Sequence, residues 1–425
     1  MIAQTVIATD LITPLGAYLR LRETGSASFL LESVEKGRLG QHSFVGAGSR
    51  LVSFQEAEAC GEPVVGYLSY DHAARLEPTV PLPEAGPDFP ESRFIVADTL
   101  VRFDHALGMA EVLCGNPDEV TQLLAEGLPS LAPGTTVAGQ TRRYPSALEY
   151  EGAVARAKGH IRAGDAFQIV LSQRAERPTS ASALELYRSL RRVNPSPYLF
   201  LLELNGLAMI GSSPETLVKA EGRDASLNPI AGTTHPGDGD AERLLTSEKD
   251  RAEHVMLVDL GRNDLSRVCT PGSVRVRRFL EPERFSHVTH LVSEVGGKLR
   301  EDVDHFDLLR ACFPAGTVSG APKVRAMQII SELEGYRRGP YAGAVGYTLP
   351  GEALDTCIAI RTIVLHDGIA YLQAGAGIVA DSDPKLEQEE CRQKLAALET
   401  AIGLAEARGS ASSGVDGGAG PEGTV

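Results

Sequence analysis

The chain has 425 residues, of which 43% are hydrophobic and 23% are charged, and it carries a net charge of −15 at pH 7. This composition is typical of a globular protein of about two or three domains, and the acidic balance argues against a nucleic-acid-binding surface, which needs clustered Lys and Arg. No apolar run is long enough to cross a bilayer and the N-terminus has no signal segment, so we expect a cytoplasmic protein that binds no membrane.

The first third of the chain shows short strand patterns separated by turns. The segment 29–48 predicts a strand, a charged turn and a second strand. The segment 78–92 holds five prolines and predicts a surface connection. Residues 92–115 predict a strand pair followed by helix-forming residues.

The next region begins with a capping box, formed by Ser146 and Glu149, ahead of a helix that Gly164 ends. The segment 167–176 alternates as a strand, and a second helix follows at 183–193. Later strands arrive in adjacent meanders and not in strict alternation with helices. We therefore expect an α+β fold with layered mixed, mostly antiparallel sheets flanked by helices.

Residues 250–264 predict a helix with two acidic side chains on one face, since Asp250 and Glu253 are three residues apart. A second acidic pair, Glu387 and Glu390, borders the apolar stripe of the last helix. Carboxylates that met across the two helices would suit Mg²⁺, which keeps much of its hydration shell. Solvated acidic first turns, favoured by the helix dipole, explain the same residues equally well.

Two Gly-rich segments predict turns, and the first of them suits an anion. Residues 316–327 place small residues before Pro322, which is well placed to start a helix, and so expose backbone N–H groups. They lack the ending of a nucleotide P-loop, which argues against ATP. Residues 373–384 form the second predicted turn, for which a tight strand connection is the simpler explanation.

Three single residues are further candidates. Arg361 follows an apolar strand, and a buried arginine needs a carboxylate partner from the protein or from a ligand. Without context, His290 is better explained as a satisfied core histidine and Tyr341 as packing. The six cysteines are scattered, without zinc or disulfide spacing, so we expect reduced, mostly buried thiols.

Several sequence blocks match one family in its order. They are NPSPYLF from residue 194, GSSPETL from 211, PIAGT from 229, AEHVMLVDLGRND from 252, HVTHLVSEVGG from 287, GTVSGAPKVRAM from 316, YAGAVGY from 341, DTCIAIRT from 355 and QAGAGIV from 373. Through them the chain resembles the chorismate-utilising enzymes, above all the large subunits of anthranilate synthase. LLES and SFVG, near the N-terminus, extend the resemblance over nearly the whole chain.

The resemblance implies a division of the chain and a metal site. Residues 1–143 would form a regulatory, tryptophan-binding region, residues 144–406 a chorismate-binding catalytic region, and residues 407–425 a disordered Gly- and Ser-rich tail. The substrate would be chorismate, a dianion. The implied Mg²⁺ ligands are Glu253 and Glu390, with Asp250 and Glu387 as outer partners.

Roles for the other matching residues follow from the resemblance too. Glu215 would protonate the departing ring hydroxyl, Thr317 would line the ring site, and His290 would assist the later loss of pyruvate. Arg361 and Tyr341 would hold the enolpyruvyl carboxylate. The complete set of implied substrate-binding residues is Gln168, Gly232, Thr233, Tyr341, Arg361, Gly375 and Gly377.

The implied reaction converts chorismate and ammonia to anthranilate and pyruvate through an aminodeoxyisochorismate intermediate, as the first step of tryptophan biosynthesis. The chain shows no glutaminase nucleophile, since none of its cysteines lies in a Gly-flanked elbow. We therefore expect a glutamine amidotransferase small subunit as the ammonia source, in a heterotetramer of two large and two small subunits.

Two positions distinguish reactions within the family. Enzymes that add water to chorismate carry a Lys base where this chain has Gln168, and an amide cannot deprotonate water. Aminodeoxychorismate synthases often carry a Lys where this chain has Ala231. Such a synthase component and a non-catalytic, tryptophan-sensing subunit are the alternative functions, and the blocks TTHPG and GQHSF depart from the common pattern.

Feedback inhibition by tryptophan is implied by the LLES and NPSPYL blocks. The expected contacts are Glu32 and Ser33 in the first block and Pro197, Tyr198 and Leu199 in the second. The alternative is that LLES is only a strand end and NPSPY only a turn.

Overall fold

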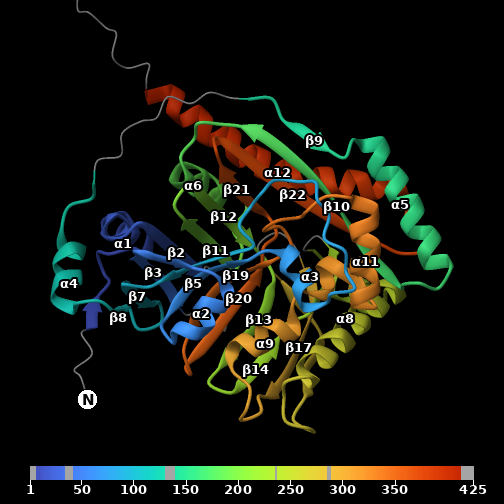
Figure 1. Cartoon of the computed structure of the whole chain (residues 1–425), viewed down its shortest axis with the longest axis horizontal. Coiled ribbons are helices and arrows are strands. Elements are labelled where there is room, and N and C mark those ends of the chain that lie inside the picture. Colours follow the sequence, from blue (N-terminus) through green and yellow to red (C-terminus); the bar gives the residue numbers. More distant parts are fainter. Residues whose placement is uncertain (1–5, 34–41, 130–138, 235–236, 285–288, 413–425) are drawn as a thin grey trace, which may run out of the picture.

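The computed structural model describes residues 6–33, 42–129, 139–234, 237–284 and 289–412. Two large sheets dominate these residues (Figure 1). Both consist of antiparallel pairs, such as β10 with β22 and β19 with β20. The expected α+β class with layered, mostly antiparallel sheets is therefore confirmed.

Sheet A contains 12 strands within the described residues. They are β1 Val6–Ala8, β2 Ala27–Ser33, β3 His42–Gly48, β7 Thr99–Asp104, β8 Met109–Cys114, β9 Arg142–Tyr144, β10 Gln168–Pro178, β11 Tyr198–Glu203, β12 Leu207–Ser213, β18 Gly320–Ala321, β21 Thr362–His366 and β22 Ile369–Ile378. Their order is β1-β8-β7-β3-β2-β11-β12-β21-β22-β10-β18, with β9 beside β10.

Sheet B contains 10 strands in the same described ranges. They are β4 Arg50–Val52, β5 Val64–Leu68, β6 Ser92–Val96, β13 Thr216–Glu221, β14 Asp224–Leu227, β15 Ile230–Thr234, β16 Arg275–Arg284, β17 Thr289–Lys298, β19 Ala344–Leu349 and β20 Ala353–Ile358. Their order is β15-β17-β14-β13-β20-β19-β5-β6-β4, with β16 beside β17. Each sheet joins strands from both sides of residue 144, as in the pairs β2–β11 and β5–β19.

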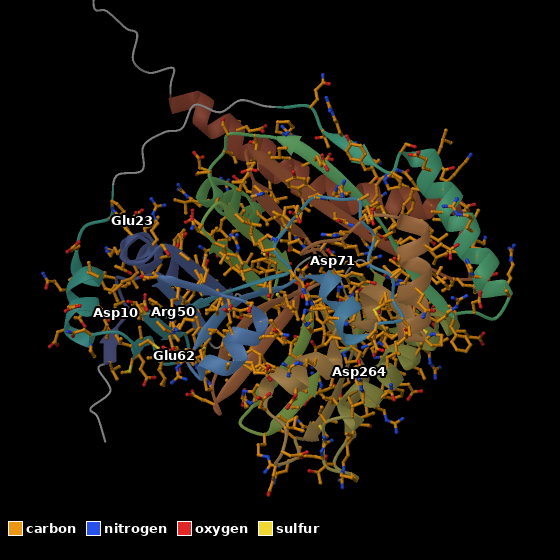
Figure 2. All side chains as sticks on the ribbon, in the orientation of Figure 1. Asp10, Glu23, Arg50, Glu62, Asp71 and Asp264 are labelled. Carbon is orange, nitrogen blue, oxygen red and sulfur yellow. The ribbon has the colours of Figure 1, made fainter. Side chains whose placement is uncertain are left out.

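Helices cover the outer faces of the two sheets (Figure 1). The helices of the described chain are α1 Pro14–Leu21, α2 Phe54–Cys60, α3 Ala73–Leu76, α4 Pro117–Ala125, α5 Ala147–Arg162, α6 Ala183–Val193, α7 Asp240–Thr246, α8 Glu248–Ser266, α9 His305–Cys312, α10 Gly316–Ser319, α11 Lys323–Glu334 and α12 Pro384–Ser412. At the surface, charged side chains such as Glu23, Arg50 and Glu62 are exposed (Figure 2).

The apolar side chains separate into cores between these layers. Strand β2 shows the cause, because successive side chains of a strand point to opposite faces. Phe29 packs between the sheets with Phe200. Leu30 points to the other side, into the core cluster that also contains Leu395 of α12. Burial of each such side chain stabilises the fold by about 1.5–3 kcal/mol.

Local sequence signals place several helices to within a residue or two. The capping box of Ser146 and Glu149 begins α5, and Gly164 follows its end with a φ of +86°. The acidic segment predicted as a helix at 250–264 forms α8. Pro322 is the N-cap of α11, as expected for a proline at a helix start.

Two local predictions were wrong. Residues 92–115 form three strands, β6, β7 and β8, where a strand pair was expected, because β8 pairs with both β7 and β1. The Gly-rich segment from Gln373 to Ile378 is not a turn: it belongs to β22, which pairs with β10.

The C-terminal part lies partly outside the described residues. Helix α12 extends to Ser412, so residues 407–412 of the expected tail are helical, whereas residues 413–425 are not described. None of the described helices has the length and apolar character that a membrane span requires.

Candidate active site

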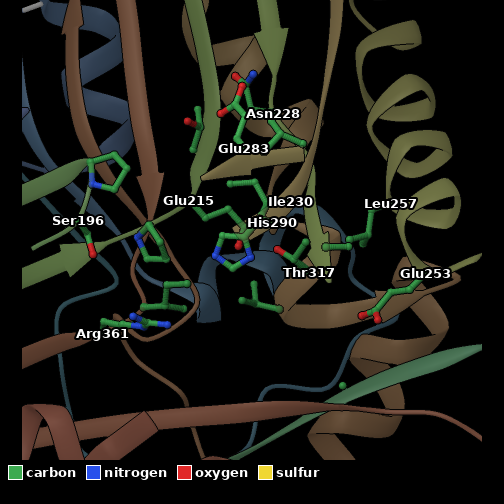
Figure 3. A pocket seen from close by; sticks show the side chains of 18 of the residues that line it. Ser196, Glu215, Asn228, Ile230, Glu253, Leu257, Glu283, His290, Thr317 and Arg361 are labelled. Carbon is green, nitrogen blue, oxygen red and sulfur yellow. The ribbon is translucent and has the colours of Figure 1, made fainter. Parts of the chain in front are cut away.

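A cavity of about 1470 Å³ lies between the sheets, with α8 and α12 completing its wall. Eleven residues singled out by the sequence line it. They are Gln168, Pro197, Glu215, Glu253, His290, Thr317, Tyr341, Arg361, Gly375, Gly377 and Glu390. Figure 3 shows His290 and Thr317 near the middle of this cavity, with Arg361 and Glu253 toward opposite sides.

Four further expected residues, Gly232, Thr233, Asp250 and Glu387, do not line this cavity. Gly232 presents its carbonyl to His290 and its Cα to Asp250, so that a Cβ there would lie 3.3 Å from Asp250 Cβ. Glu387 is half-buried near the start of α12, one turn before Glu390. The backbone of Thr233 belongs to β15, and its side chain is outside the described part of the chain.

Glu215 lies in the connection from β12 to β13, in the middle of the sequence block SSPET. Burial raises the pKa of this carboxyl to about 7, and the Thr317 hydroxyl and the Lys394 ammonium oppose the rise. Thr317 Oγ1 makes no hydrogen bond of good geometry among the described residues, so its hydroxyl acts on Glu215 only through its closeness. Glu215 is therefore partly protonated near neutral pH, as a general acid requires.

His290 extends from β17 toward the cavity. Its Nδ1 lies 2.8 Å from the Gly232 carbonyl oxygen. Since a carbonyl only accepts hydrogen bonds, Nδ1 carries the proton and Nε2 carries the lone pair in the neutral ring. Burial, and then the charge of Arg361, lower the pKa of His290 despite this hydrogen bond, so the ring is a neutral base at pH 7.

Arg361 follows β20 and has a φ of +50°, a left-handed conformation that costs about 1–2 kcal/mol for a non-glycine residue. Its Nη1 donates to Asn194 Oδ1 at 3.1 Å. No carboxylate of the described residues pairs with it, and burial lowers the pKa of its guanidinium. A desolvated cation without an anionic partner is a ready site for a substrate carboxylate.

Tyr341 and the glycines of β22 fit closely together. A Cβ on Gly375 would lie 2.8 Å from the Tyr341 hydroxyl, and a Cβ on Gly377 would lie 2.6 Å from Gln168 Nε2. Both distances are too short for a side chain, so only glycine leaves room for these groups. The glycines that predicted a turn are required by contacts across the cavity.

Gln168 begins β10, and Glu253 lies in α8. Gln168 Nε2 donates to Glu253 Oε1 at 3.0 Å, while Gln168 Oε1 is buried with no hydrogen-bond partner among the described residues. Gln168 Oε1, an acceptor without a donor in the described part of the chain, lies on the amide that bonds the Glu253 carboxylate. Together these oxygens suit a cation or a ligand that donates a hydrogen bond. The amide thus fixes one oxygen of Glu253 and leaves an acceptor beside it.

Sequence analysis missed Lys394, which lines the same cavity. Its Nζ lies 2.7 Å from Glu390 Oε1 and donates to the Gly375 carbonyl at 2.8 Å. Lys394 follows Glu390 by four residues in α12, a spacing that predicts an ion pair on one helix face. The i,i+4 spacing was therefore the available signal.

The carboxylates of Glu253 and Glu390 reach one cavity from separate helices, α8 and α12. Hard oxygen ligands with space for water are the donor set that Mg²⁺ prefers, and these residues fit it. A separate and more compact acidic cluster lies outside this cavity. It consists of Glu58, Asp304 and Asp307, whose ligand atoms lie within 4.8 Å of one another. Arg310 pairs with Glu58 and Asp307 in this cluster, and Asp304 is the N-cap of α9. The guanidinium of Arg310 therefore already supplies the positive charge for these carboxylates.

A second, smaller cavity of about 70 Å³ lies between the sheets. Four of the expected tryptophan contacts, Glu32, Ser33, Tyr198 and Leu199, line it, whereas Pro197 lines the large cavity. Buried Glu32 accepts a hydrogen bond from Tyr187 Oη, and Arg191 Nη2 lies 3.3 Å from its other oxygen. Lys219 and Glu221 of β13 line both cavities, which therefore adjoin.

In the large cavity, Glu215, whose pKa is about 7, and the neutral base His290 lie together with Arg361, which has no carboxylate partner among the described residues. Proton transfer on a bound anion follows from that chemistry, and it places the protein among enzymes and not among binding modules.

Comparison with known proteins shows the family. Residues 23–400 match the model of the chorismate binding enzymes, and the chain belongs to that family. It is 44% identical to anthranilate synthase component 1 of Streptomyces coelicolor, over 94% of this chain and 88% of that protein. The component 1 of Thermus thermophilus is 41% identical over 94% of this chain and 97% of that protein.

The fold is similar to the crystal structure of anthranilate synthase component I from Streptococcus pneumoniae TIGR4. The TM-score is 0.78 at 32% identity, covering 93% of this chain and 99% of that chain. The enzyme class and the substrate family expected from the sequence blocks are therefore confirmed.

Proposed function

We propose that this chain is the synthase subunit of an anthranilate synthase, which converts chorismate and ammonia to anthranilate, pyruvate and water. The observation that carries the proposal is that Glu215, His290 and Arg361 share one cavity. Relatives named anthranilate synthase component 1, at 44% and 41% identity over nearly the full chain, support the same reaction. In the cell this would be the first step of tryptophan synthesis.

Binding of the substrate would use the cation at the cavity wall. Chorismate carries two carboxylates, and the guanidinium of Arg361 would pair with the one on the enolpyruvyl group. The Tyr341 hydroxyl and the backbone at Gly375 and Gly377 lie along the same wall. The pairing would hold the ring beneath Thr317 in one orientation, and fixed orientation is a large part of catalysis.

The amination step needs an acid because hydroxide leaves poorly. Glu215 would donate its proton to the ring hydroxyl as the C–O bond breaks and ammonia forms the new C–N bond. Proton transfer of this kind contributes typically about 10²–10⁴-fold to the rate. Gln168 cannot activate water, so the amide favours ammonia over water as nucleophile.

The elimination step needs a base. Neutral His290 would remove the proton from the amine-bearing ring carbon, and the ether bond to the enolpyruvyl group would break. Enolpyruvate then takes up a proton to become pyruvate, and the ring becomes aromatic. His290→Ala is expected to stall the reaction at the aminated intermediate, whereas unchanged anthranilate output would rule out this role.

Glu253 and Glu390 would hold Mg²⁺, with Asp250 and Glu387 as outer partners. The ion, when bound, neutralises the ring carboxylate and so offsets its repulsion from the acidic wall. Lys394 would then release Glu390 and keep its hydrogen bond to Gly375. Glu390→Gln should lose Mg²⁺ dependence together with activity, and full activity of this variant would contradict the assignment.

Ammonia would come from a separate glutamine amidotransferase subunit, in a heterotetramer of two large and two small subunits. Tryptophan would inhibit from the second cavity, with the region 1–143 supplying Glu32 and Ser33 and the catalytic region supplying Tyr198 and Leu199.

Incubation with chorismate, Mg²⁺ and ammonium, followed by anthranilate fluorescence, tests this function. A fluorescent product that requires all three components is expected. An aminated product without pyruvate would indicate an aminodeoxychorismate synthase, and no product at all would indicate a tryptophan-sensing subunit.

A further inference from the structure

An ion pair behind the cavity wall has no part in the proposed chemistry. Glu334 is the last residue of α11, and Arg338 follows it by four residues. Their side chains are 3% and 1% exposed, respectively. Arg338 Nη2 lies 2.7 Å from Glu334 Oε1, and Nε lies 2.9 Å from Oε2. The two groups therefore form a bidentate, desolvated pair.

The guanidinium also bonds the backbone of two wall segments. Arg338 Nη1 donates to the Val318 carbonyl at 2.8 Å, and Nη2 donates to the Val170 carbonyl at 2.7 Å. Val318 and Val170 both line the cavity. Val318 follows Thr317 in the sequence, and Val170 is two residues after Gln168. One side chain thus ties α10 to β10.

The carboxylate extends the same connection to β22. Glu334 Oε1 accepts from both the backbone N and the Oγ of Ser172, each at 2.8 Å. The Ser172 hydroxyl in turn accepts from Gln373 Nε2 at 2.8 Å. Gln373 lines the cavity two residues before Gly375.

Two aromatic rings, those of Tyr341 and Tyr70, lie near the guanidinium. Arg338 Cζ is 5.7 Å from the centre of the Tyr341 ring and 4.6 Å from that of Tyr70. The turn itself is fixed, since the backbone N–H groups of Arg338 and Gly339 donate to Asp71 at 3.1 and 3.0 Å. Asp71 is labelled in Figure 2.

A pair of this kind is poorly explained by stability alone. Desolvation of two charges costs about as much as their attraction returns, and apolar residues of similar volume often stabilise a fold as well or better. What the pair supplies is fixed geometry, because Arg338 bonds the backbone of α10 and of β10 while Glu334 bonds Ser172 of β10. Thr317 belongs to α10 and Gln168 to β10, while Tyr341 follows Arg338 by three residues in the chain.

We propose that Arg338, clamped by Glu334, is a positioning residue for the reaction: it holds Tyr341 and the walls that carry Thr317 and Gln168 at the distances the substrate needs. The proposal rests on the proposed function. Displacement of a reacting group by about 1 Å costs on the order of 100-fold in rate.

The test replaces the whole pair, since removal of one partner would leave a buried charge. The variant Arg338→Met/Glu334→Met is expected to fold with a melting temperature close to that of the wild type and to lose about 100-fold in kcat/KM for chorismate. Arg338→Lys keeps the charge but cannot reach Glu334 and both carbonyls together. This variant should lose less activity than the double variant. It provides the test if the double variant does not fold.

The matched control is Arg177→Met/Glu406→Met, which removes an ion pair between the far end of β10 and α12. Its kcat/KM should stay within about twofold of the wild type, as expected for a pair with no contact to the site.

A double-mutant cycle separates positioning from loss of structure. Tyr341→Phe should cost less in the Arg338→Met/Glu334→Met background than in the wild type, because the hydroxyl is no longer held in place. In the Arg177→Met/Glu406→Met background its cost should be unchanged. A kcat/KM within twofold of wild type for both Arg338 variants, or the full cost of Tyr341→Phe in the first background, would overturn the proposal. Absence of anthranilate formation by the wild type would instead reject the proposed function.

Discussion

Glu215 and its surroundings set the pH dependence of the proposed reaction. Burial raises the pKa of its carboxyl to about 7. The protonated acid is present below that pH and is lost above it, so kcat/KM at a constant free ammonia concentration should fall as pH rises past about 7. Glu215→Gln should lose about 10²–10⁴-fold in kcat and the descending limb with it.

Lys394 provides a control for this assignment, since its ammonium lowers the pKa of Glu215. In Lys394→Met the descending limb should therefore move to a higher pH. A limb that stays in place in both variants would show that another group controls it.

Arg361 should contribute to substrate binding and little to stability. Its guanidinium is desolvated and lacks a carboxylate partner among the described residues. Arg361→Met should raise the KM for chorismate by about 100-fold, the effect of one lost charge-assisted pair. Its melting temperature should stay the same or rise, because a half-buried cation without a carboxylate partner among the described residues is removed. A lower melting temperature with unchanged KM would contradict this role.

Strand β22 should be intolerant of side chains at its glycines. A Cβ on Gly377 would lie 2.6 Å from Gln168 Nε2, whose amide holds Glu253. Gly377→Ala should displace that amide and raise the Mg²⁺ concentration needed for half-maximal activity by about tenfold, as expected when a residue that orients a metal ligand is lost. Titration of activity with Mg²⁺ measures this.

Gly403 in α12 is the matched control, since a Cβ there would meet nothing within 4 Å. Gly403→Ala should leave the Mg²⁺ dependence unchanged and stabilise the helix by about 0.5–1 kcal/mol. An equal effect of the two substitutions on Mg²⁺ dependence would count against the role of Gly377.

Elements with local signals were predictable from the sequence, and elements set by distant contacts were not. Helices α5 and α8 follow from capping residues and an apolar stripe close in sequence. Strand β22 was not predicted because its glycines are required by close contacts with Tyr341 and Gln168. These two residues come from other parts of the chain. The acidic pairs on α8 and α12 were found from their spacing, and the ion pair of Glu390 with Lys394 was missed although its four-residue spacing is also a local signal.

The whole molecule places two cavities between the same pair of sheets. Lys219 and Glu221 of β13 line both, so we expect an occupant of one cavity to affect binding in the other. Tryptophan should stabilise the protein against heat, by about 2.7 kcal/mol at 100 times its Kd. If it weakens chorismate binding, chorismate must weaken tryptophan binding by the same factor.

Thermal shifts with each ligand, alone and together, measure this coupling. The variant Tyr198→Phe, which loses the hydrogen bonds of that hydroxyl to Thr216 and Asp355, should reduce it. Stabilisation by tryptophan that is independent of chorismate would contradict coupling between the cavities.

In the proposed function, one cavity performs both amination and elimination. Its most direct test follows pyruvate and anthranilate together, in the wild type and in His290→Ala, with chorismate, Mg²⁺ and ammonium. The wild type should release the two products in equal amounts, while His290→Ala should consume chorismate and release neither. Pyruvate and anthranilate in equal amounts from His290→Ala at the wild-type rate, or no pyruvate from the wild type, would contradict the account.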